Sequence, residues 1–195
     1  MASIVDIYND ALNELGQTSV SSVKANTAGA RAIDAVFATE LDVFLEEHFW
    51  NFAKTRASLA RRTATPLFGF KYLYGLPSDF LLIWQEERPN MLYRIEGGSW
   101  LCNAEEVNLV YVRRVTSANT MTGLFRRALA MRLAVRVCRK VTGANPDADL
   151  KARRDEAVRI AKLLNARNAG RMEPVRPNAL LLARAGVRSG SGEGA

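Results

Sequence analysis

The hydrophobic periodicity of this chain changes twice, and this constrains its fold more than any other feature. Apolar residues recur at helical spacing up to about residue 50 and again after about residue 120. Between these segments lie short strand-like runs that are separated by glycine and proline. We therefore predict an α+β protein, in which N- and C-terminal helices form a bundle and a small antiparallel β domain is inserted between them.

The predicted domain boundaries follow these changes of pattern. The first change falls within residues 49–79, which hold seven of the sixteen aromatic residues. We expect these aromatic side chains to pack against both units and not to form the working surface. Residues 1–50 and 120–170 are assigned to the helical bundle, residues 51–119 to the inserted β domain, and residues 171–195 to a flexible, extended C-terminal arm.

Four helices are expected from spacing and capping signals. Ser3 and Asp6 form an N-terminal capping signature, and Gly16 is a natural stop. Asn145 followed by Pro146 is expected to begin the last helix. The expected helices cover residues 4–15, 28–49, about 122–143, and 146 to near 170.

The strands are expected to form an antiparallel meander. Gly97 and Gly98 have the chemistry of a two-residue hairpin turn, and residues 103–106 are expected to make a second tight connection. The last strand has apolar residues on both faces, which predicts a central position in the sheet. Residues 62–79 are expected to form turns and short extended pieces. The expected strands cover residues 53–61, 80–85, 91–96, 99–102 and 107–114.

The net charge of +7 is unevenly distributed along the chain. Residues 1–50 hold two Lys or Arg and eight Asp or Glu, whereas residues 121–195 hold sixteen and six. Such an imbalance indicates charged partners, or identical subunits that meet acidic face to basic face; the alternative is accidental segregation on a solvated surface. The acidic face of the second expected helix consists of Asp34, Glu40, Asp42, Glu46 and Glu47.

A basic stripe is expected on the third helix. Like charges at this spacing repel each other, so an anionic surface opposite them would stabilise the stripe. The candidates are nucleic acid and the acidic face of the second helix, from the same or a neighbouring subunit. The alternative is a set of arginines on a solvated face, with their aliphatic parts on apolar surface. The stripe consists of Arg132, Arg136, Arg139 and Lys140.

The C-terminal residues combine prolines, arginines and a short apolar run at 179–183. Such a segment is typical of an arm that becomes ordered on a partner, and the alternative is a frayed terminus. Its candidate contact residues are Arg176, Leu180, Leu181, Leu182, Arg184 and Arg188.

Catalytic constellations are not apparent in the sequence. His48 is the only histidine, and we expect it to be a capping or packing residue. The two cysteines form neither a disulfide framework nor a zinc pattern, which indicates a reducing compartment. No apolar run approaches the roughly 20 residues that cross a bilayer, so no membrane association is expected. We expect no enzyme activity, metal or cofactor, although a glycosidase with distant carboxylates is left open.

One block of the sequence resembles a known family. It is similar to the tail tubular protein A family, the head-to-tail adaptors of short-tailed bacteriophages, and the resemblance extends over residues 1–165. The residues that carry it are Trp50, Asn51, Phe52, Ala53, Pro66, Phe68, Gly69, Tyr72, Leu76, Pro77 and Asp79.

The resemblance implies a structural virion protein that is synthesised in the host cytoplasm. In such proteins a homo-oligomeric ring of twelve subunits joins the portal protein to the tail nozzle protein, and double-stranded DNA passes through its channel. The C-terminal arm would then contact the portal, and the basic stripe would face a neighbouring subunit or the DNA. Two other functions are left open, a DNA-binding accessory protein and a virion-associated cell-wall hydrolase.

Overall fold

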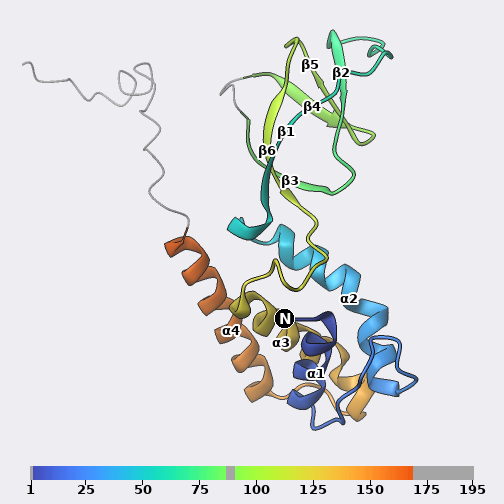
Figure 1. Ribbon diagram of the computed structural model, residues 1–195, viewed down its shortest axis with the longest axis vertical. Helices are drawn as coiled ribbons and strands as arrows, with labels where there is room; N and C mark the ends of the chain where they lie inside the picture. The colour runs from blue at the N-terminus through green and yellow to red at the C-terminus, as the bar shows by residue number, and fades with distance from the viewer. Residues whose placement is uncertain (1, 87–90, 169–195) are drawn as a thin grey trace, which may run out of the picture.

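The computed structural model describes residues 2–86 and 91–168, and this part of the chain is a mixed α+β structure (Figure 1). Its α-helices are α1 (Ile4–Glu14), α2 (Ala28–Glu46), α3 (Gly123–Thr142) and α4 (Ala148–Arg167). Its strands are β1 (Lys54–Ser58), β2 (Tyr72–Gly75), β3 (Phe80–Glu86), β4 (Tyr93–Glu96), β5 (Ser99–Cys102) and β6 (Asn108–Arg113), and a short 3-10 helix, η1 (Asn51–Ala53), precedes β1. The α+β class and the order of helices, strands and helices are confirmed.

The strands form two three-stranded antiparallel sheets, with the orders β1-β6-β3 and β2-β5-β4. The expected meander is therefore wrong, because β5 and β6 follow each other in the chain but belong to different sheets. Two details of the prediction are confirmed: β6 is the central strand of its sheet, and the β4–β5 hairpin turns at Gly97 and Gly98. Both glycines have a positive φ, 55° and 69°, which side chains disfavour.

Strand β2 shows why the meander failed as a prediction. It has only four residues and ends in Gly75, so its own pattern is weak. It is held by long-range contacts instead: Tyr74 is buried, pairs with Trp100 of β5, and donates from its hydroxyl to the Ala104 carbonyl at 2.7 Å. These tertiary contacts therefore stabilise β2 as a strand, although its local sequence pattern is weak.

The helices pack around α3, which contacts α1, α2 and α4. Thr122 caps its N-terminus, because the Thr122 hydroxyl accepts a hydrogen bond from the Phe125 backbone, and Gly143 ends it at a φ of 78°. Nine residues of α3 are buried, which makes it the central helix of this unit. The predicted capping box of Ser3 and Asp6 on α1 is also confirmed.

Two predicted helix ends are wrong. Helix α2 ends at Glu46 and not near residue 49. Just beyond this end, Nε1 of the buried Trp50 ring donates to the Phe44 carbonyl at 2.8 Å. Helix α4 is capped by Asp147 and not by Asn145, because the Asp147 carboxylate accepts from the Leu150 backbone at 2.7 Å. A carboxylate at this position also interacts favourably with the helix dipole.

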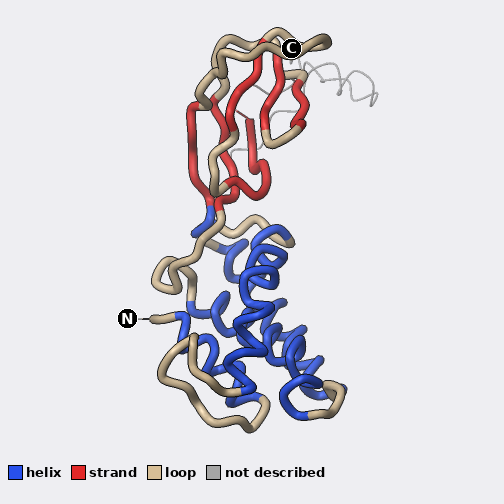
Figure 2. Tube along the Cα trace, turned by 90° about the vertical axis from the view of Figure 1, so that its right-hand side faces the viewer, coloured by secondary structure: helices blue, strands red, loops and turns tan. Residues whose placement is uncertain are grey.

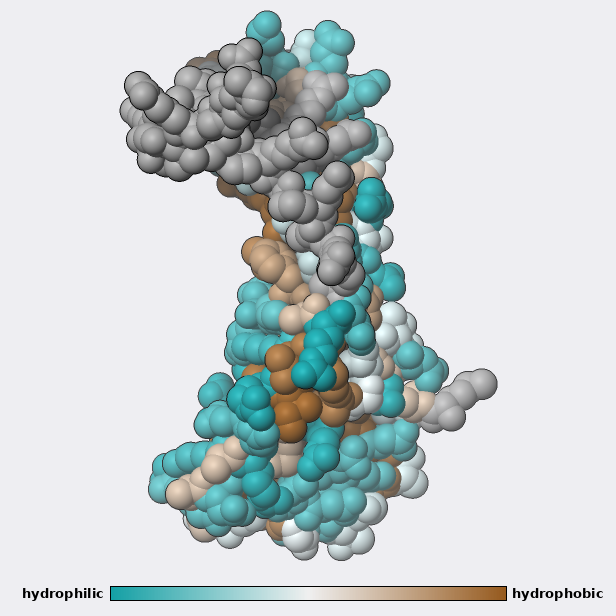
Figure 3. Space-filling model, turned by 90° about the vertical axis from the view of Figure 1, so that its left-hand side faces the viewer, coloured by the Kyte–Doolittle hydropathy of each residue, from teal (hydrophilic) through white to brown (hydrophobic). Residues whose placement is uncertain are grey.

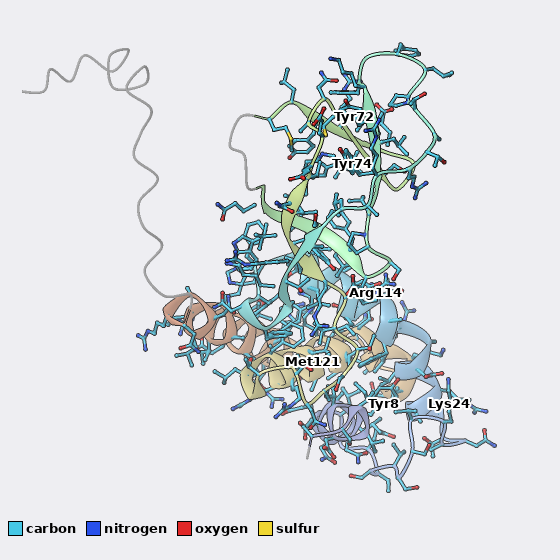
Figure 4. All side chains as sticks on the ribbon, turned by 45° about the horizontal axis from the view of Figure 1, so that its top comes forward. Tyr8, Lys24, Tyr72, Tyr74, Arg114 and Met121 are labelled. Carbon is cyan, nitrogen blue, oxygen red and sulfur yellow. The ribbon has the colours of Figure 1, made fainter. Side chains whose placement is uncertain are left out.

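The strands lie at one end of an elongated molecule and the helices at the other, joined through a narrow waist (Figure 2). The first sheet is the one that rests on the helices, since Val112, Leu82 and Trp84 pack with the helical core. Arg114, which follows β6, reaches α2 and donates from Nε and Nη2 to Asp42 at 2.7 and 2.6 Å (Figure 4). A second core is shared by the two sheets, since Tyr74, Trp100 and Cys102 of the second sheet cluster with Leu109 and Tyr111 of β6.

Candidate interaction surfaces

The waist is built around residues 50–53. They are the first part of the family-like block, the set of residues from Trp50 to Asp79 that carries the family resemblance. Trp50 and Phe125 are buried, with ring centroids 4.9 Å apart, and Phe44 stacks on Phe125 at 4.6 Å. Phe52 packs edge-on against Phe125 at 4.8 Å. Such aromatic pairs stabilise beyond their buried area. Aromatic residues from three separate segments therefore fix the start of the sheet on the helices.

Polar contacts complete the waist. The side-chain amide of Asn165 on α4 donates to the Phe49 carbonyl at 2.7 Å and hydrogen bonds to His48 Nε2 at 3.0 Å. His48 also packs edge-on against Trp50, with centroids 4.9 Å apart. Burial, and then the charge of Lys162, lower the pKa of His48. The expectation that His48 is a packing residue is confirmed by these contacts.

In the second part of the block, from Pro66 to Asp79, some side chains make contacts within the chain and others are exposed. Asp79 accepts a hydrogen bond from the Tyr111 hydroxyl at 2.9 Å, and burial, followed by Asp79 itself, raises the pKa of Tyr111 to about 12. Tyr72 of β2 lies under the Arg61 guanidinium at 3.9 Å. Phe68, however, is 86% exposed, so the expectation that the aromatic residues of this stretch pack against the two units is wrong there.

The remaining residues of the block are structural. Ala53 is buried in the helical core, whereas Leu76 is half-buried against the second core. The Pro77 carbonyl accepts from the Phe80 backbone at 3.1 Å, and Gly69 has a φ of 85° in the loop that contains Pro66.

Most of the predicted acidic face is paired within the chain. Asp34 pairs with Lys24 at 2.9 Å, near the start of α2 (Figure 4), and Asp42 pairs with Arg114 as described above. Glu40 and Glu47 both contact Arg132. In the part of the chain that the structure describes, Glu46 is the one member of this face without an ion pair.

Arg132 differs from the other members of the basic stripe. Its Nε donates to Glu40 at 2.6 Å, its Nη1 contacts Glu47 at 2.7 Å, and its guanidinium lies over the Phe44 ring at 4.8 Å. It is therefore an internal link between α3 and α2, so for Arg132 the anionic surface opposite the basic stripe is the acidic face of the same chain. Arg136, Arg139 and Lys140 are exposed. Within residues 2–86 and 91–168, none of these three forms an ion pair.

Two apolar surfaces were missed by the sequence analysis. Leu67 and Phe68 are 97% and 86% exposed in the loop between β1 and β2. The second surface is a groove between α3 and α4, with apolar residues such as Met131 and Ile160 in its lining. Adjacent apolar residues in a loop could have indicated the first surface. The second depends on how two helices pack, and no local pattern shows that.

Among the described residues, no group of three or more His, Cys, Asp or Glu side chains is close enough to hold a metal ion. Cys102 and Cys138 are both buried and unpaired with each other. Among the helices that the structure describes, none combines the length and apolar character needed to cross a membrane.

The predicted arm contacts, Arg176, Leu180, Leu181, Leu182, Arg184 and Arg188, lie outside the described residues. No protein-family model matches this chain, and no characterised protein matches it significantly.

Proposed function

We propose that this chain is a structural virion protein, a subunit of a head-to-tail adaptor ring between the portal protein and the tail nozzle protein. The observation that carries the proposal is the family-like block around the waist. Its residues Trp50 and Asn51 fix an inserted β unit on a helical unit through Phe125 and Asn165. This arrangement fits the fold that the resemblance implies, a helical bundle with an inserted β domain.

In this proposal, twelve copies form the ring and the helical units act as bundles that meet side by side. Arg132 is satisfied within its own chain, so the contact between subunits falls to Arg136, Arg139 and Lys140 on one copy. Glu46, the exposed and unpaired member of the acidic face of α2, is their candidate partner on the next copy. Charge complementarity of this kind favours correct register and orientation.

The arm supplies the contact with the portal in this proposal. Its leucines would bind an apolar surface, and its arginines would bind carboxylates around that surface. A chain that ends at Arg171 tests this assignment, because its helices and sheets remain complete. We expect the shortened chain to stay folded but to lose co-purification with the portal protein of the same phage. Equal co-purification of both chains would contradict the role of the arm.

DNA binding is a second candidate function, favoured by the exposed and unpaired Arg136, Arg139 and Lys140. If these side chains neutralise three phosphates of a DNA duplex, the affinity should fall as salt is added. A plot of the logarithm of the binding constant against the logarithm of the salt concentration should have a slope near −3. Fluorescence anisotropy with a labelled duplex measures this slope. If replacing all three residues by alanine leaves the affinity and its slope unchanged, these residues do not bind DNA.

A further inference from the structure

The groove between α3 and α4 is lined largely by apolar side chains. Leu124 and Met131 of α3 and Ala157 and Ile160 of α4 supply its apolar lining, and its volume is about 340 Å³. Figure 3 shows a hydrophobic patch on the side of the helical unit where α4 lies. The charged residues that line the groove are Glu14, Arg127, Arg153 and Glu156.

Helix α4 is poorly covered by the rest of the described chain. Of its 20 residues only Leu150 and Ala161 are buried, whereas α3, of equal length, buries nine. Leu163 is 45% exposed, and Ile160 is only half-buried. A helix on the surface of a protein normally buries an apolar stripe against its neighbours. This side of α4 is therefore open to a further apolar segment.

We propose that the apolar run at residues 179–183 of the same chain binds in this groove. The run reads Ala-Leu-Leu-Leu-Ala, and ten residues separate it from Asn168, the cap of α4. Ten residues in extended conformation span at most about 33–36 Å. Ala152, at the far end of the groove, lies about 24 Å from Asn168 along the helix at 1.5 Å per residue. The run therefore reaches every part of the groove from its own α4.

The chemistry of the two partners is complementary. Three leucines match the apolar lining, because binding there removes their side chains from water. Arginines precede and follow the run, at positions 176 and 184. An adjoining hollow contains Asp10, which forms no ion pair in the described residues, beside Glu14, which pairs with Arg153. An arginine beside the leucines therefore finds a carboxylate at the edge of the groove.

This inference does not depend on the ring. If the adaptor function also holds, the groove keeps the leucines of the arm away from water until the portal takes them over. Binding in the groove and binding to the portal then compete for the same leucines. A subunit would therefore release its apolar arm only when the portal is there to bind it.

Disulfide trapping in the full chain tests the inference. Ile160→Cys with Leu181→Cys places one thiol in the groove and one in the run, and Ala38→Cys with Leu181→Cys is the matched control on the exposed face of α2. The native Cys102 and Cys138 are buried and react slowly. We expect the groove pair to form an intrachain disulfide at least about tenfold faster than the control pair, at a rate independent of protein concentration. Equal rates, or a disulfide that joins two chains, would overturn it.

Limited proteolysis gives a second measurement without new cysteines. Ile160→Glu places a charge in the groove, and Leu163→Glu places the same charge on an exposed position of α4 outside the groove lining. Trypsin cleavage after Arg184 should become several-fold faster in the Ile160 variant only. Cleavage at the same rate in the full chain and in both variants would contradict binding of the run in this groove.

Discussion

Asn51 and Asn165 hydrogen bond to each other across 114 residues of sequence. The side-chain oxygen of Asn165 accepts from the Asn51 backbone at 2.9 Å, and the Asn51 side chain donates to the Asn165 carbonyl at 2.6 Å. The pair connects α4 to the point where α2 gives way to the sheet. It therefore helps to fix the β unit relative to the helices.

Replacing Asn165 by alanine should destabilise the protein. The substitution removes the contacts of the side chain with Asn51, Phe49 and His48, and it leaves the part-buried Asn51 N–H without this partner. We expect a loss of roughly 1–3 kcal/mol in the free energy of unfolding, measured by urea denaturation. The matched control is Asn168→Ala, at an exposed position three residues later. Equal losses in both variants would contradict the role of Asn165.

His48 should make stability depend on pH. The oxygen of Asn165 accepts from Asn51, so its NH₂ group faces His48, and Nε2 of a neutral imidazole must accept. Burial, and then Lys162, lower the pKa of His48 below its ordinary value of 6.5. As the pH falls through about 6.5, the unfolded chain takes up a proton that the folded chain refuses, so the folded state loses stability. Above this range the contribution is complete.

Unfolding free energies between pH 8 and 5.5 measure this effect. His48 is the only histidine, so His48→Gln should flatten the curve near neutral pH. A curve of the same slope in both proteins would show that another group is responsible.

Arg132 and Arg136 should respond differently to the same substitution. Arg132 is 15% exposed and pairs with Glu40, which is 16% exposed, so Arg132→Ala leaves a largely buried carboxylate unpaired. We expect a cost of roughly 2–3 kcal/mol from chemical denaturation. Arg136→Ala, on the exposed side of α3, should change stability by less than about 0.5 kcal/mol. Arg132→Lys should not restore stability, since a single ammonium group cannot reproduce the fork that contacts two carboxylates.

Gly29 permits the close approach of α1 and α2. A Cβ atom at this position would lie 2.5 Å from Cδ2 of Leu12, which is buried. Gly29→Ala should therefore cost roughly 1–3 kcal/mol through overpacking, although alanine is the better helix former. Gly123→Ala, also in the first turn of a helix, meets only the end of the Arg126 side chain at 3.8 Å and should be neutral or stabilising. Thermal unfolding of the two variants should shift in opposite directions or by clearly different amounts.

The helices could be predicted largely from sequence because their caps are local signals. Thr122 and Gly143 bound α3 as expected, and Ser3 caps α1. The sheets could not be predicted in the same way, since β1 pairs with β6 across some 50 residues of sequence. Strand pairing depends on such non-local contacts, which no single run of sequence specifies.

The candidate surfaces were predicted only in part. Spacing on the helices showed which charged residues share a face, but it could not show that Arg132 turns inward to Glu40 and Glu47. The remaining exposed members, Arg136, Arg139 and Lys140, are the ones left for a partner. The groove beside Met131 was missed because it requires the relative position of α3 and α4.

Electron microscopy of the full chain mixed with the portal protein of the same phage tests the central proposal most directly. The adaptor account predicts a closed ring, expected to have twelve copies of this chain, stacked coaxially on the portal. It also predicts that reversing the charges of Arg136, Arg139 and Lys140 to glutamate prevents the closed ring. A bare portal beside unassembled chains, at every salt and protein concentration tried, would contradict the account.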